Sequence, residues 1–487
     1  MRAGASPACG SIERLAPPSS PTSRRNRLVL AACILGSIIV FVDSTVVNVA
    51  LPAIQRDLGG GLALQQWVVD AYLLTLGSLL LVGGSLGDLF GARLVFMLGI
   101  AAFGITSVLC AAAPDGTTLI LARGLQGIAG AVLTPAGLAV ITATFTGEER
   151  GAAIGSWTAW TGVAFVVGPL VGGWLVTNTS WRWIFLINVP FVAVTLALVA
   201  YAVPKREPGE QRARLDVVGG TLCALGLAGP VFALIEAPTR GWGDPLIVGT
   251  LIAGIVLLLV FVAWERRAPQ PMLPLALFSR RNFSFANVET VTVYAGLSTL
   301  TFFLVLFVQQ LDGYSALQSG MALLPITLVM FALSPRVGRL SMRHGPRLFM
   351  GLGPLVAAAG LLGTIRLTPG FSYWLELLPP LLVFSVGLSM IVAPLTATVL
   401  SDADDHDAGI ASGVNNAVAR VAGLLGIAIV GAAVAGADNR LDQSGFRLAM
   451  AITAALVAAG GAIGLAGIRN PRSTTVVSPE MNPGIRA

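Results

Sequence analysis

The sequence predicts an all-α integral membrane protein in which two six-helix bundles are joined by two inserted helices, fourteen transmembrane helices in all. Three observations predict this fold. Apolar residues make up 55% of the chain and charged residues only 11%. Apolar runs long enough to cross a bilayer recur from Leu28 to Ile468. A loop in the first half of the chain is repeated in the second half.

The low charge indicates that lipid surrounds much of the surface, because soluble globular chains usually carry about a quarter charged residues. The formal charge of +6 does not indicate a nucleic-acid partner, since the basic residues lie in short loops between apolar runs. The cysteines are scattered and form no close pair of the kind that a disulfide framework or a metal site needs. We interpret them as structural: Cys9, Cys33, Cys110 and Cys223.

Each apolar run bounded by charged residues, glycine or proline predicts one helix, and about 20 residues span a hydrocarbon core of about 30 Å. The first six helices are predicted at 28–50, 66–87, 94–113, 118–141, 152–176 and 183–203. Two more are predicted at 216–236 and 245–264. The last six are predicted at 283–309, 319–338, 348–366, 375–399, 409–435 and 447–468.

An even number of spans places both termini on one side of the membrane. Arginine is concentrated on that side, for example at Arg24, Arg93 and Arg347, and is rarer on the other. The positive-inside rule therefore predicts that both termini are cytoplasmic. The segment 401–407 is acidic yet cytoplasmic in this topology, but acidic residues contribute little to the rule.

The repeated loop supports two homologous bundles. Four positions recur at a spacing of 254 residues: Gly84, Leu86, Gly91 and Arg93 correspond to Gly338, Leu340, Gly345 and Arg347. Both loops fall between the second and third helices of a six-helix set, as expected for parallel repeats. The alternative is a glycine- and arginine-containing turn that recurs by chance.

These observations predict five segments. A disordered cytoplasmic tail occupies 1–27, and the first bundle occupies 28–204. A linker with the two extra helices occupies 205–282, the second bundle 283–468, and a second cytoplasmic tail 469–487.

Four stretches resemble motifs of the major facilitator superfamily. GSLGDLFGAR (84–93) resembles the signature between helices 2 and 3, and FVDSTVVNVALP (41–52) resembles the helix 1 motif of drug:proton antiporters. LARGLQGIAG (121–130) is similar to the helix 4 motif with its buried arginine, and GVAFVVGPLVGG (162–173) to the helix 5 antiporter motif. With fourteen spans, the resemblance implies the major facilitator fold and the fourteen-helix drug:proton antiporter branch.

The loop motif departs from the family at Leu89 and Ala92, where basic residues are common, and the second copy has Met342 in place of Asp88. We expect Asp88 and Arg93, with Gly84 and Gly91, to form a cytoplasmic gate that holds the bundles in one conformation. The alternative is a turn with solvated charges.

The helix 5 motif is rich in small residues that allow helices to approach closely, and proline invites a bend. We expect a hinge or gate at four residues, although packing alone is an alternative: Gly168, Pro169, Gly172 and Gly173.

Ionisable residues inside a membrane cost about 3 kcal/mol each even on the milder insertion scale, so each one needs an explanation. Asp43 in the first helix matches the acidic residue of the family motif and is the first candidate for a proton carrier. Arg123 matches the buried arginine of the family and is expected to act on a neighbouring carboxylate, most simply Asp43. The alternative for both residues is a structural role.

Asp70 lies near the outer end of the second helix, where it is expected to attract a cationic substrate or relay protons to the exterior; exposure at the interface is the alternative. Glu289 and Arg420 are further embedded charges, and the sequence does not show whether they meet. A substrate cavity lined by several polar and aromatic residues is expected, with packing as the alternative: Trp157, Trp160, Gln309, Gln310, Asn415 and Asn416.

The chain has one lysine, Lys205, and lacks the G-x-x-x-x-G-K-[ST] loop that holds nucleotide phosphates. With His344 and His406 as the only histidines, neither an enzyme nor a cofactor or metal site is expected. The resemblance implies a monomeric plasma-membrane transporter that exports hydrophobic or cationic drugs in exchange for protons by alternating access. The alternative within transport is an exporter of an endogenous metabolite or lipid.

Overall fold

The computed structural model describes residues 24–204, 215–401, 408–435 and 439–470. Most of the two predicted tails, Lys205 and the acidic segment 402–407 with His406 lie outside the described residues. The described chain is helical, as expected where lipid offers no hydrogen bonds and each backbone group must find its partner within the protein.

The first bundle is built from long helices with short turns between them. The Asp115 carboxylate accepts a hydrogen bond from the Thr118 backbone N–H at 2.9 Å, which caps α4 and lowers the pKa of Asp115. The helices are α1 (Arg24–Leu58), α2 (Gly61–Phe90), α3 (Ala92–Ala112), α4 (Gly116–Thr144), α5 (Gly147–Asn178) and the short α6 (Trp183–Leu186), which leads into α7 (Asn188–Ala202).

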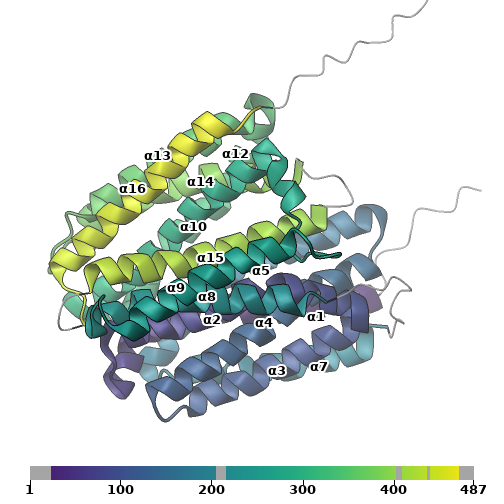
Figure 1. The fold of residues 1–487 in the computed structure, drawn as a ribbon, viewed down its shortest axis with the longest axis horizontal. Coiled ribbons are helices and arrows are strands. Elements are labelled where there is room, and N and C mark those ends of the chain that lie inside the picture. Colours follow the sequence, from purple (N-terminus) through teal and green to yellow (C-terminus); the bar gives the residue numbers. More distant parts are fainter. Residues whose placement is uncertain (1–23, 205–214, 402–407, 436–438, 471–487) are drawn as a thin grey trace, which may run out of the picture.

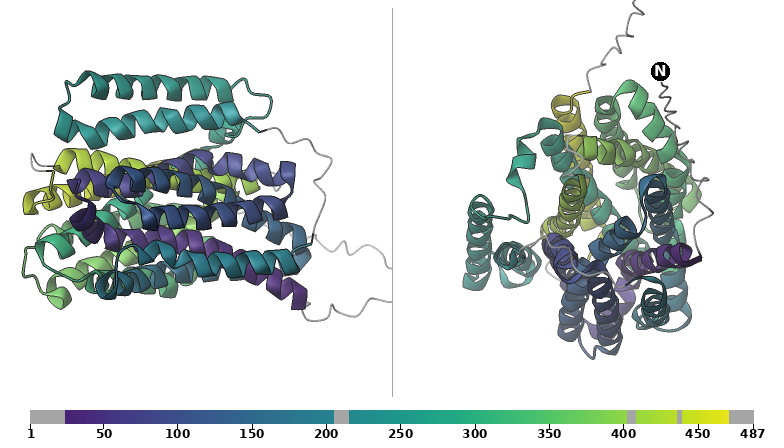
Figure 2. Two further views of the ribbon diagram at one scale, coloured as in Figure 1. Left: turned by 90° about the horizontal axis from the view of Figure 1, so that it is seen from below. Right: turned by 90° about the vertical axis from the view of Figure 1, so that its right-hand side faces the viewer.

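Two helices follow as a hairpin, α8 (Val217–Arg240) and α9 (Pro245–Glu265). They lie along one side of the molecule, apart from the other helices (Figure 2). Only α8 packs closely against the bundles, through α2 and α15 (Ala408–Val434). This position outside the two bundles is what an inserted pair of helices predicts.

The second bundle begins after a 3₁₀ turn, η1 (Leu275–Ser279). Two of its helices include a turn of π-helix: η2 (Phe307–Leu311) ends the first, and η3 (Tyr373–Leu377) begins another. Its helices are α10 (Arg281–Leu306), α11 (Ala316–Ala322), α12 (Leu324–His344), α13 (Pro346–Thr364), α14 (Leu378–Ser401), α15 and α16 (Gln443–Gly467).

In the described chain, 14 helical spans are long and apolar enough to cross a membrane, which confirms the predicted number. Several extend beyond the predicted bounds. For example, α1 runs from Arg24 to Leu58 although the apolar run predicted 28–50. Hydropathy marks the part of a helix that matches lipid, whereas backbone hydrogen bonding continues into the polar ends.

The loop repeat has the same structure in both bundles. Gly91 and Gly345 both adopt left-handed φ angles, 85° and 83°, which favour glycine. Arg93 donates to the Ala200 carbonyl at 3.0 Å, and Arg347 donates to the Leu465 carbonyl at 2.7 Å. Each arginine thus binds the carboxyl end of the last helix of its own bundle, where unpaired carbonyls and the helix dipole favour a cation.

A second arginine does the same in each bundle. Arg25, at the start of α1, donates to the Ala202 carbonyl at 2.9 Å. Arg281, at the start of α10, donates to the Gly467 carbonyl at 2.8 Å. Arg25 and Arg281 therefore join the first helix of each bundle to the last, and Arg93 and Arg347 join the third helix to the last. All four contacts lie at the side of the molecule where α1 begins and α16 ends, which we call the terminal side.

The bundles lie side by side, with α13 and α16 at one edge of the molecule and α3 and α7 at the other (Figure 1). Hydrogen bonds between described residues of the two bundles lie towards the far side, opposite the terminal side. Leu62 N–H donates to the Asn439 carbonyl at 2.8 Å, and the Gln310 amide donates to Gln55 at 2.9 Å. The far side is therefore closed in this conformation.

Candidate functional site

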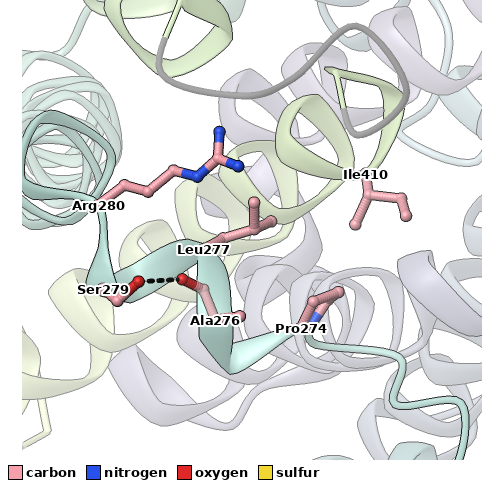
Figure 3. Close-up of a pocket in the computed structure, with 6 residues that line it drawn as sticks. All are labelled: Pro274, Ala276, Leu277, Ser279, Arg280 and Ile410. Atoms are coloured by element: carbon pink, nitrogen blue, oxygen red, sulfur yellow. Dashed lines mark hydrogen bonds between the residues drawn. The ribbon is translucent and has the colours of Figure 1, made fainter.

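A shallow pocket on the terminal side is not where the sequence predicts the functional site (Figure 3). It is formed by the turn that leads into α10 and by one residue of α15, and none of its six lining side chains is acidic. They are Pro274, Ala276, Leu277, Ser279, Arg280 and Ile410. The embedded charges lie elsewhere, within and between the bundles.

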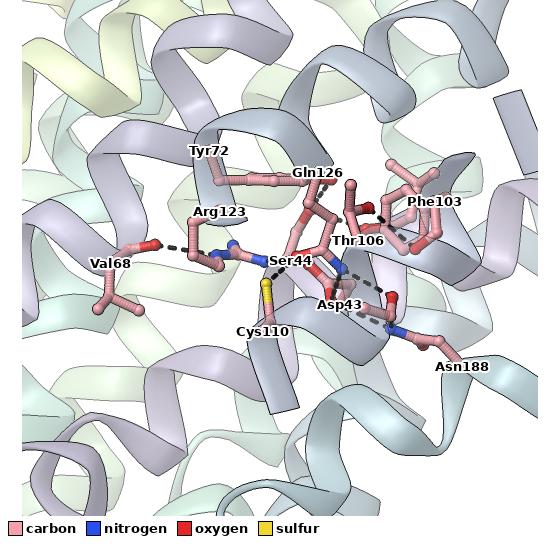
Figure 4. Close-up of polar contacts among 12 residues, drawn as sticks. Asp43, Ser44, Val68, Tyr72, Phe103, Thr106, Cys110, Arg123, Gln126 and Asn188 are labelled. Carbon is pink, nitrogen blue, oxygen red and sulfur yellow. Dashed lines mark hydrogen bonds and ion pairs between the residues drawn. The ribbon is translucent and has the colours of Figure 1, made fainter. Parts of the chain in front are cut away.

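Asp43 and Arg123 form an ion pair in the middle of the first bundle (Figure 4). The Arg123 Nη1 donates to Asp43 Oδ2 at 2.6 Å, and both residues are buried, with 0% and 1% of their surface exposed. Asp43 comes from α1 and Arg123 from α4, as the sequence led us to expect.

Two amide side chains complete the environment of Asp43. Gln126 donates to Asp43 Oδ1 at 2.9 Å, and Asn188 donates to the same oxygen at 3.2 Å. Both amides also donate to the Ser107 hydroxyl, at 3.0 and 3.2 Å. Residues from α1, α3, α4 and α7 therefore meet around one carboxylate, and both of its oxygens have partners.

Arg123 is fixed by further contacts. Its Nε donates to the Val68 carbonyl of α2 at 3.0 Å, and its guanidinium lies 4.2 Å from the centre of the Tyr72 ring. Taking two charges out of water is costly, and a buried pair persists only where such extra hydrogen bonds satisfy both groups. The network can thus hold Asp43 ionised in a dry core, and a proton added to Asp43 would remove the charge that holds Arg123.

The sequence reasoning missed Gln126, Ser107 and Asn188. Gln126 stands three residues after Arg123, on the same face of α4, so its position was a usable signal. Ser107 and Asn188 are polar residues in largely apolar helices far away in sequence, and only the packing of α3 and α7 brings them to Asp43.

Asp70 is fully buried, with 0% of its surface exposed, and neither carboxylate oxygen has a hydrogen-bond partner among the described residues. It lies on the face of α2 that packs against α15, between Gln66, which donates to the Ile427 carbonyl, and Gly77, which packs against Arg420. The alternative interpretation, exposure at the membrane interface, is therefore wrong for this conformation.

The predicted cavity residues are spread over several sites. Trp157 donates to the Ser37 hydroxyl at 2.8 Å, whereas Trp160 is 52% exposed. Gln309 donates to the Val49 carbonyl at 3.0 Å, which joins the bundles on the far side. Asn415 donates to Thr290 at 2.7 Å within the second bundle. No hydrogen bond joins one of these described side chains to another.

Of the four predicted gate residues in the first loop, two shape a helix end and two do not. Gly91 and Arg93 shape a helix end within the first bundle, as described above. Asp88 is exposed and makes no ion pair with Arg93, within the part of the chain that the structure describes. Gly84 packs loosely near Pro135.

The helix 5 residues do lie at interfaces. Gly168 and Gly172 pack against α1, where an added Cβ would meet Thr45 and Val46 side chains at 2.0 Å. Gly173 and Pro169 contact α11 of the second bundle, where the added Cβ would meet the Ala316 carbonyl at 2.6 Å.

Glu289 and Arg420 have different neighbours. Glu289 is fully buried in α10 against Gly464 of α16, and in the part of the chain that the structure describes both of its carboxylate oxygens lack a hydrogen-bond partner. Arg420 of α15 lies over Phe41 of the first bundle, with 5.5 Å between the guanidinium carbon and the ring centre. The structure thus shows no contact between these two embedded charges in the described chain.

Comparison with known proteins agrees with the fold. A profile of the Major Facilitator Superfamily matches residues 33–427. The chain belongs to this superfamily. The resemblance inferred from the four motifs is thus confirmed, and the superfamily is one of transporters.

Curated relatives include exporters and resistance proteins. The puromycin resistance protein pur8 of Streptomyces alboniger is 38% identical over 84% of this chain and 82% of its own length. The tetracenomycin C resistance and export protein of Streptomyces glaucescens is 35% identical over 86% of this chain and 78% of its own length. The cephamycin export protein CmcT of Amycolatopsis lactamdurans is 36% identical over 85% of both chains.

Solved structures share the fold. A bacterial homologue of the human lysosomal transporter Spinster, in an inward-facing and unoccupied conformation, has a TM-score of 0.67 at 17% identity and covers 92% of this chain and 97% of its own. The POT family transporter PepTSo has a TM-score of 0.68 at 16% identity with the same coverage. At this identity the likeness shows the architecture alone.

Proposed function

We propose that the protein is a secondary active exporter that moves a hydrophobic drug or antibiotic across the plasma membrane in exchange for protons. The observation that carries this proposal is the buried Asp43–Arg123 pair with its two amide partners. A carboxylate placed in the dry core of a transporter, next to a cation that cannot lose its proton, suits a group that alternately binds a proton and an ion-pair partner. The names of the curated relatives support the substrate class.

The energy source follows from the same chemistry. One proton moving through a potential of 100 mV supplies about 2.3 kcal/mol, enough to support a substrate gradient of roughly tenfold or more. In the proposed cycle the bundles alternate between two arrangements, and the closed far side is the outer side, because both termini are proposed to be cytoplasmic. The conformation described above then opens towards the cytoplasm and is ready to receive substrate. We propose that the protein works as a monomer.

The contacts of α5 with α1 and α11 support a role for its small residues in gating. In this proposal Gly173 and Pro169 close the outer side, because the α5 backbone touches α11 of the second bundle there. Gly168 and Gly172 keep α5 against α1 during the movement. The loop residues Gly84, Asp88, Gly91 and Arg93 act at the cytoplasmic side, where Arg93 holds α7 by its carboxyl end.

Of the two roles expected for Asp70, burial favours the relay of protons. Its carboxylate lies in an apolar contact between α2 and α15 with no partner, so a cationic substrate has no path to it in this conformation. Separation of the bundles on the outer side would expose Asp70 to water. Asp70→Asn should therefore weaken pH-driven export about equally for cationic and neutral compounds, measured as initial rates. A loss confined to cations would instead assign Asp70 to substrate binding.

The function is tested by efflux from inside-out vesicles with a panel of antibiotics and lipophilic compounds, with and without a proton uncoupler. The proposal predicts accumulation that the uncoupler abolishes. Accumulation that is indifferent to the uncoupler would contradict proton exchange. Transport of a cell metabolite or lipid but of no antibiotic would support the alternative exporter.

A further inference from the structure

Arg420 lies where helices of both bundles meet. It belongs to α15, and a Cβ placed on Gly77 of α2 would lie 3.2 Å from the Arg420 Cβ. Its guanidinium reaches over the Phe41 ring of α1 at 5.5 Å. The side chain is partly exposed, so it borders both protein and space accessible to solvent.

Aromatic groups surround this guanidinium. The Phe41 ring lies 5.4 Å from the Phe165 ring of α5, and Phe165 is 41% exposed. Two phenols, those of Tyr72 and Tyr294, are close enough for Arg420 to act on them electrostatically. Arg420 of α15, Phe41 of α1 and Phe165 of α5 therefore form a positively charged aromatic surface between the bundles.

Within the described chain, Arg420 makes no ion pair or hydrogen bond, although a guanidinium carries five N–H donors. Arg123, whose guanidinium lies over the Tyr72 ring, is in contrast neutralised by Asp43. An uncompensated arginine at membrane depth is costly and is associated with substrate pathways. The described part of the protein therefore supplies no anionic acceptor for the Arg420 guanidinium.

We propose that Arg420, Phe41 and Phe165 form the substrate subsite, and that it takes planar aromatic compounds that carry a negatively charged group. The guanidinium pairs with the anionic group, and the two rings pack on the aromatic part. The inference rests on the proposed export function and narrows it, because it assigns acidic aromatic compounds rather than cations as preferred substrates.

The subsite adjoins the proton site. Tyr72 has its ring against Arg123, and its hydroxyl lies 3.4 Å from the Ser44 hydroxyl of α1, three residues after Phe41. Tyr72 thus contacts Arg123 and lies within electrostatic reach of Arg420. An anion bound at Arg420 would act on the tyrosine that packs against Arg123, and through it substrate and proton would influence each other.

Two other roles for Arg420 need to be distinguished. The guanidinium and Phe41 ring make a cation–π contact, which by itself would only hold α15 to α1. An anionic lipid headgroup entering between the bundles would also supply a negative charge. The experiment therefore compares dyes of one ring system and opposite charge, in membranes with and without anionic lipid.

The test uses the full-length protein in proteoliposomes of phosphatidylcholine, with fluorescein as the anionic dye and a rhodamine of the same ring system as the cationic dye. The variants are Arg420→Gln, Arg420→Lys and Phe41→Leu. Arg440→Gln, in an exposed loop of the far side, is the matched control for the loss of one positive charge. Binding is read from dye fluorescence anisotropy, and transport from initial rates under a pH gradient.

We expect Arg420→Gln to weaken fluorescein binding at least about tenfold, or ~1.4 kcal/mol, and rhodamine binding less than about twofold. The affinity of Arg420→Lys for fluorescein should lie between those of the unchanged protein and Arg420→Gln, because lysine keeps the charge without the planar fork. Phe41→Leu should weaken the binding of both dyes, and Arg440→Gln should weaken the binding of neither. Equal losses for both dyes in Arg420→Gln, or no loss for fluorescein in either Arg420 variant, would overturn the subsite.

Added phosphatidylglycerol gives a further check. Fluorescein binding should not change with it. Competition by phosphatidylglycerol that disappears in Arg420→Gln would assign Arg420 to lipid headgroups and overturn the substrate assignment. Because binding needs no proton gradient, fluorescein binding without pH-driven transport would contradict the proposed function while leaving the subsite standing.

Discussion

The two bundles share a scaffold but differ in the chemistry of their cores. Arg25 and Arg281 hold the same helix ends, so they mark equivalent positions. Asp43 lies 18 residues after Arg25, and the residue 18 after Arg281 is Thr299. Thr299 is fully buried, and its hydroxyl has no hydrogen-bond partner.

The other members of the network are also replaced. Gly99 packs against Leu133 in the first bundle, as Gly353 packs against Ile391 in the second. Counted from these contacts, and from the ends of α7 and α16, the positions of the network hold mostly apolar residues in the second bundle. Arg123, Gln126, Ser107 and Asn188 correspond to Leu381, Phe384, Leu361 and Thr453.

At one position the second bundle, and not the first, has the ionisable side chain. Glu289 lies eight residues after Arg281, and the residue eight after Arg25 is Cys33, which is buried among apolar side chains. The comparison teaches that the helix-end arginines and left-handed glycines maintain the shared architecture, while buried polar residues vary between the copies. A satisfied ion-pair network occurs in the first bundle, and an isolated carboxyl group occurs in the second.

The largest effect is expected from Arg123→Met. It leaves Asp43 buried without its cation, which should lower the free energy of unfolding by about 3–5 kcal/mol. The equivalent position is already apolar, so the matched control is Leu381→Met, for which we expect a loss under about 1.5 kcal/mol. Thermal unfolding of the purified protein in detergent, followed by tryptophan fluorescence, measures both. Equal losses in the free energy of unfolding would show that the ion pair in the first bundle contributes no more to stability than the apolar packing at the equivalent position of the second.

An effect of opposite sign is expected from Glu289→Met. Its carboxyl oxygens have no partners, and an unsatisfied buried polar group costs about 1–3 kcal/mol, so an apolar side chain of similar size should raise stability. Asp43→Met, which removes a satisfied carboxylate, should lower it in the same unfolding assay. Destabilisation by Glu289→Met would mean that Glu289 has a partner in the membrane, and the contrast between the bundles would weaken.

The smallest effects are expected where the bundles agree. Arg93→Ala and Arg347→Ala each remove one bond to a helix end, so each should cost about 0.3–1 kcal/mol, and the two costs should be similar. Both stability and pH-driven export are measured. If Arg93→Ala abolishes export while Arg347→Ala does not, the first loop has a gating role beyond its part in the scaffold.

The fold was predictable because its signals are local. Apolar runs predict the spans, and the recurrence of Gly91 and Arg93 as Gly345 and Arg347 predicts two bundles, since a left-handed turn needs glycine and a helix end attracts a cation. Helix ends were less predictable, because helices such as α1 continue beyond their apolar part.

The candidate site was predictable only in part. Asp43 and Arg123 stood out as charges in apolar helices, and their pairing was the simplest expectation. Asn188 gave no such signal, because an asparagine near a helix start has many possible roles. Nor did the sequence reveal that Asp70 is enclosed by α15, since this depends on how the two bundles meet on the far side.

The central claim is that Asp43 loads the proton that drives export. Asp43→Asn keeps the size and hydrogen-bonding capacity of the side chain but cannot exchange a proton. In proteoliposomes, the variant should lose export driven by a pH gradient, about 100-fold or more, while exchange of labelled for unlabelled substrate at equal pH continues at a rate close to that of the unchanged protein. Export by Asp43→Asn that still follows the pH gradient would contradict the claim.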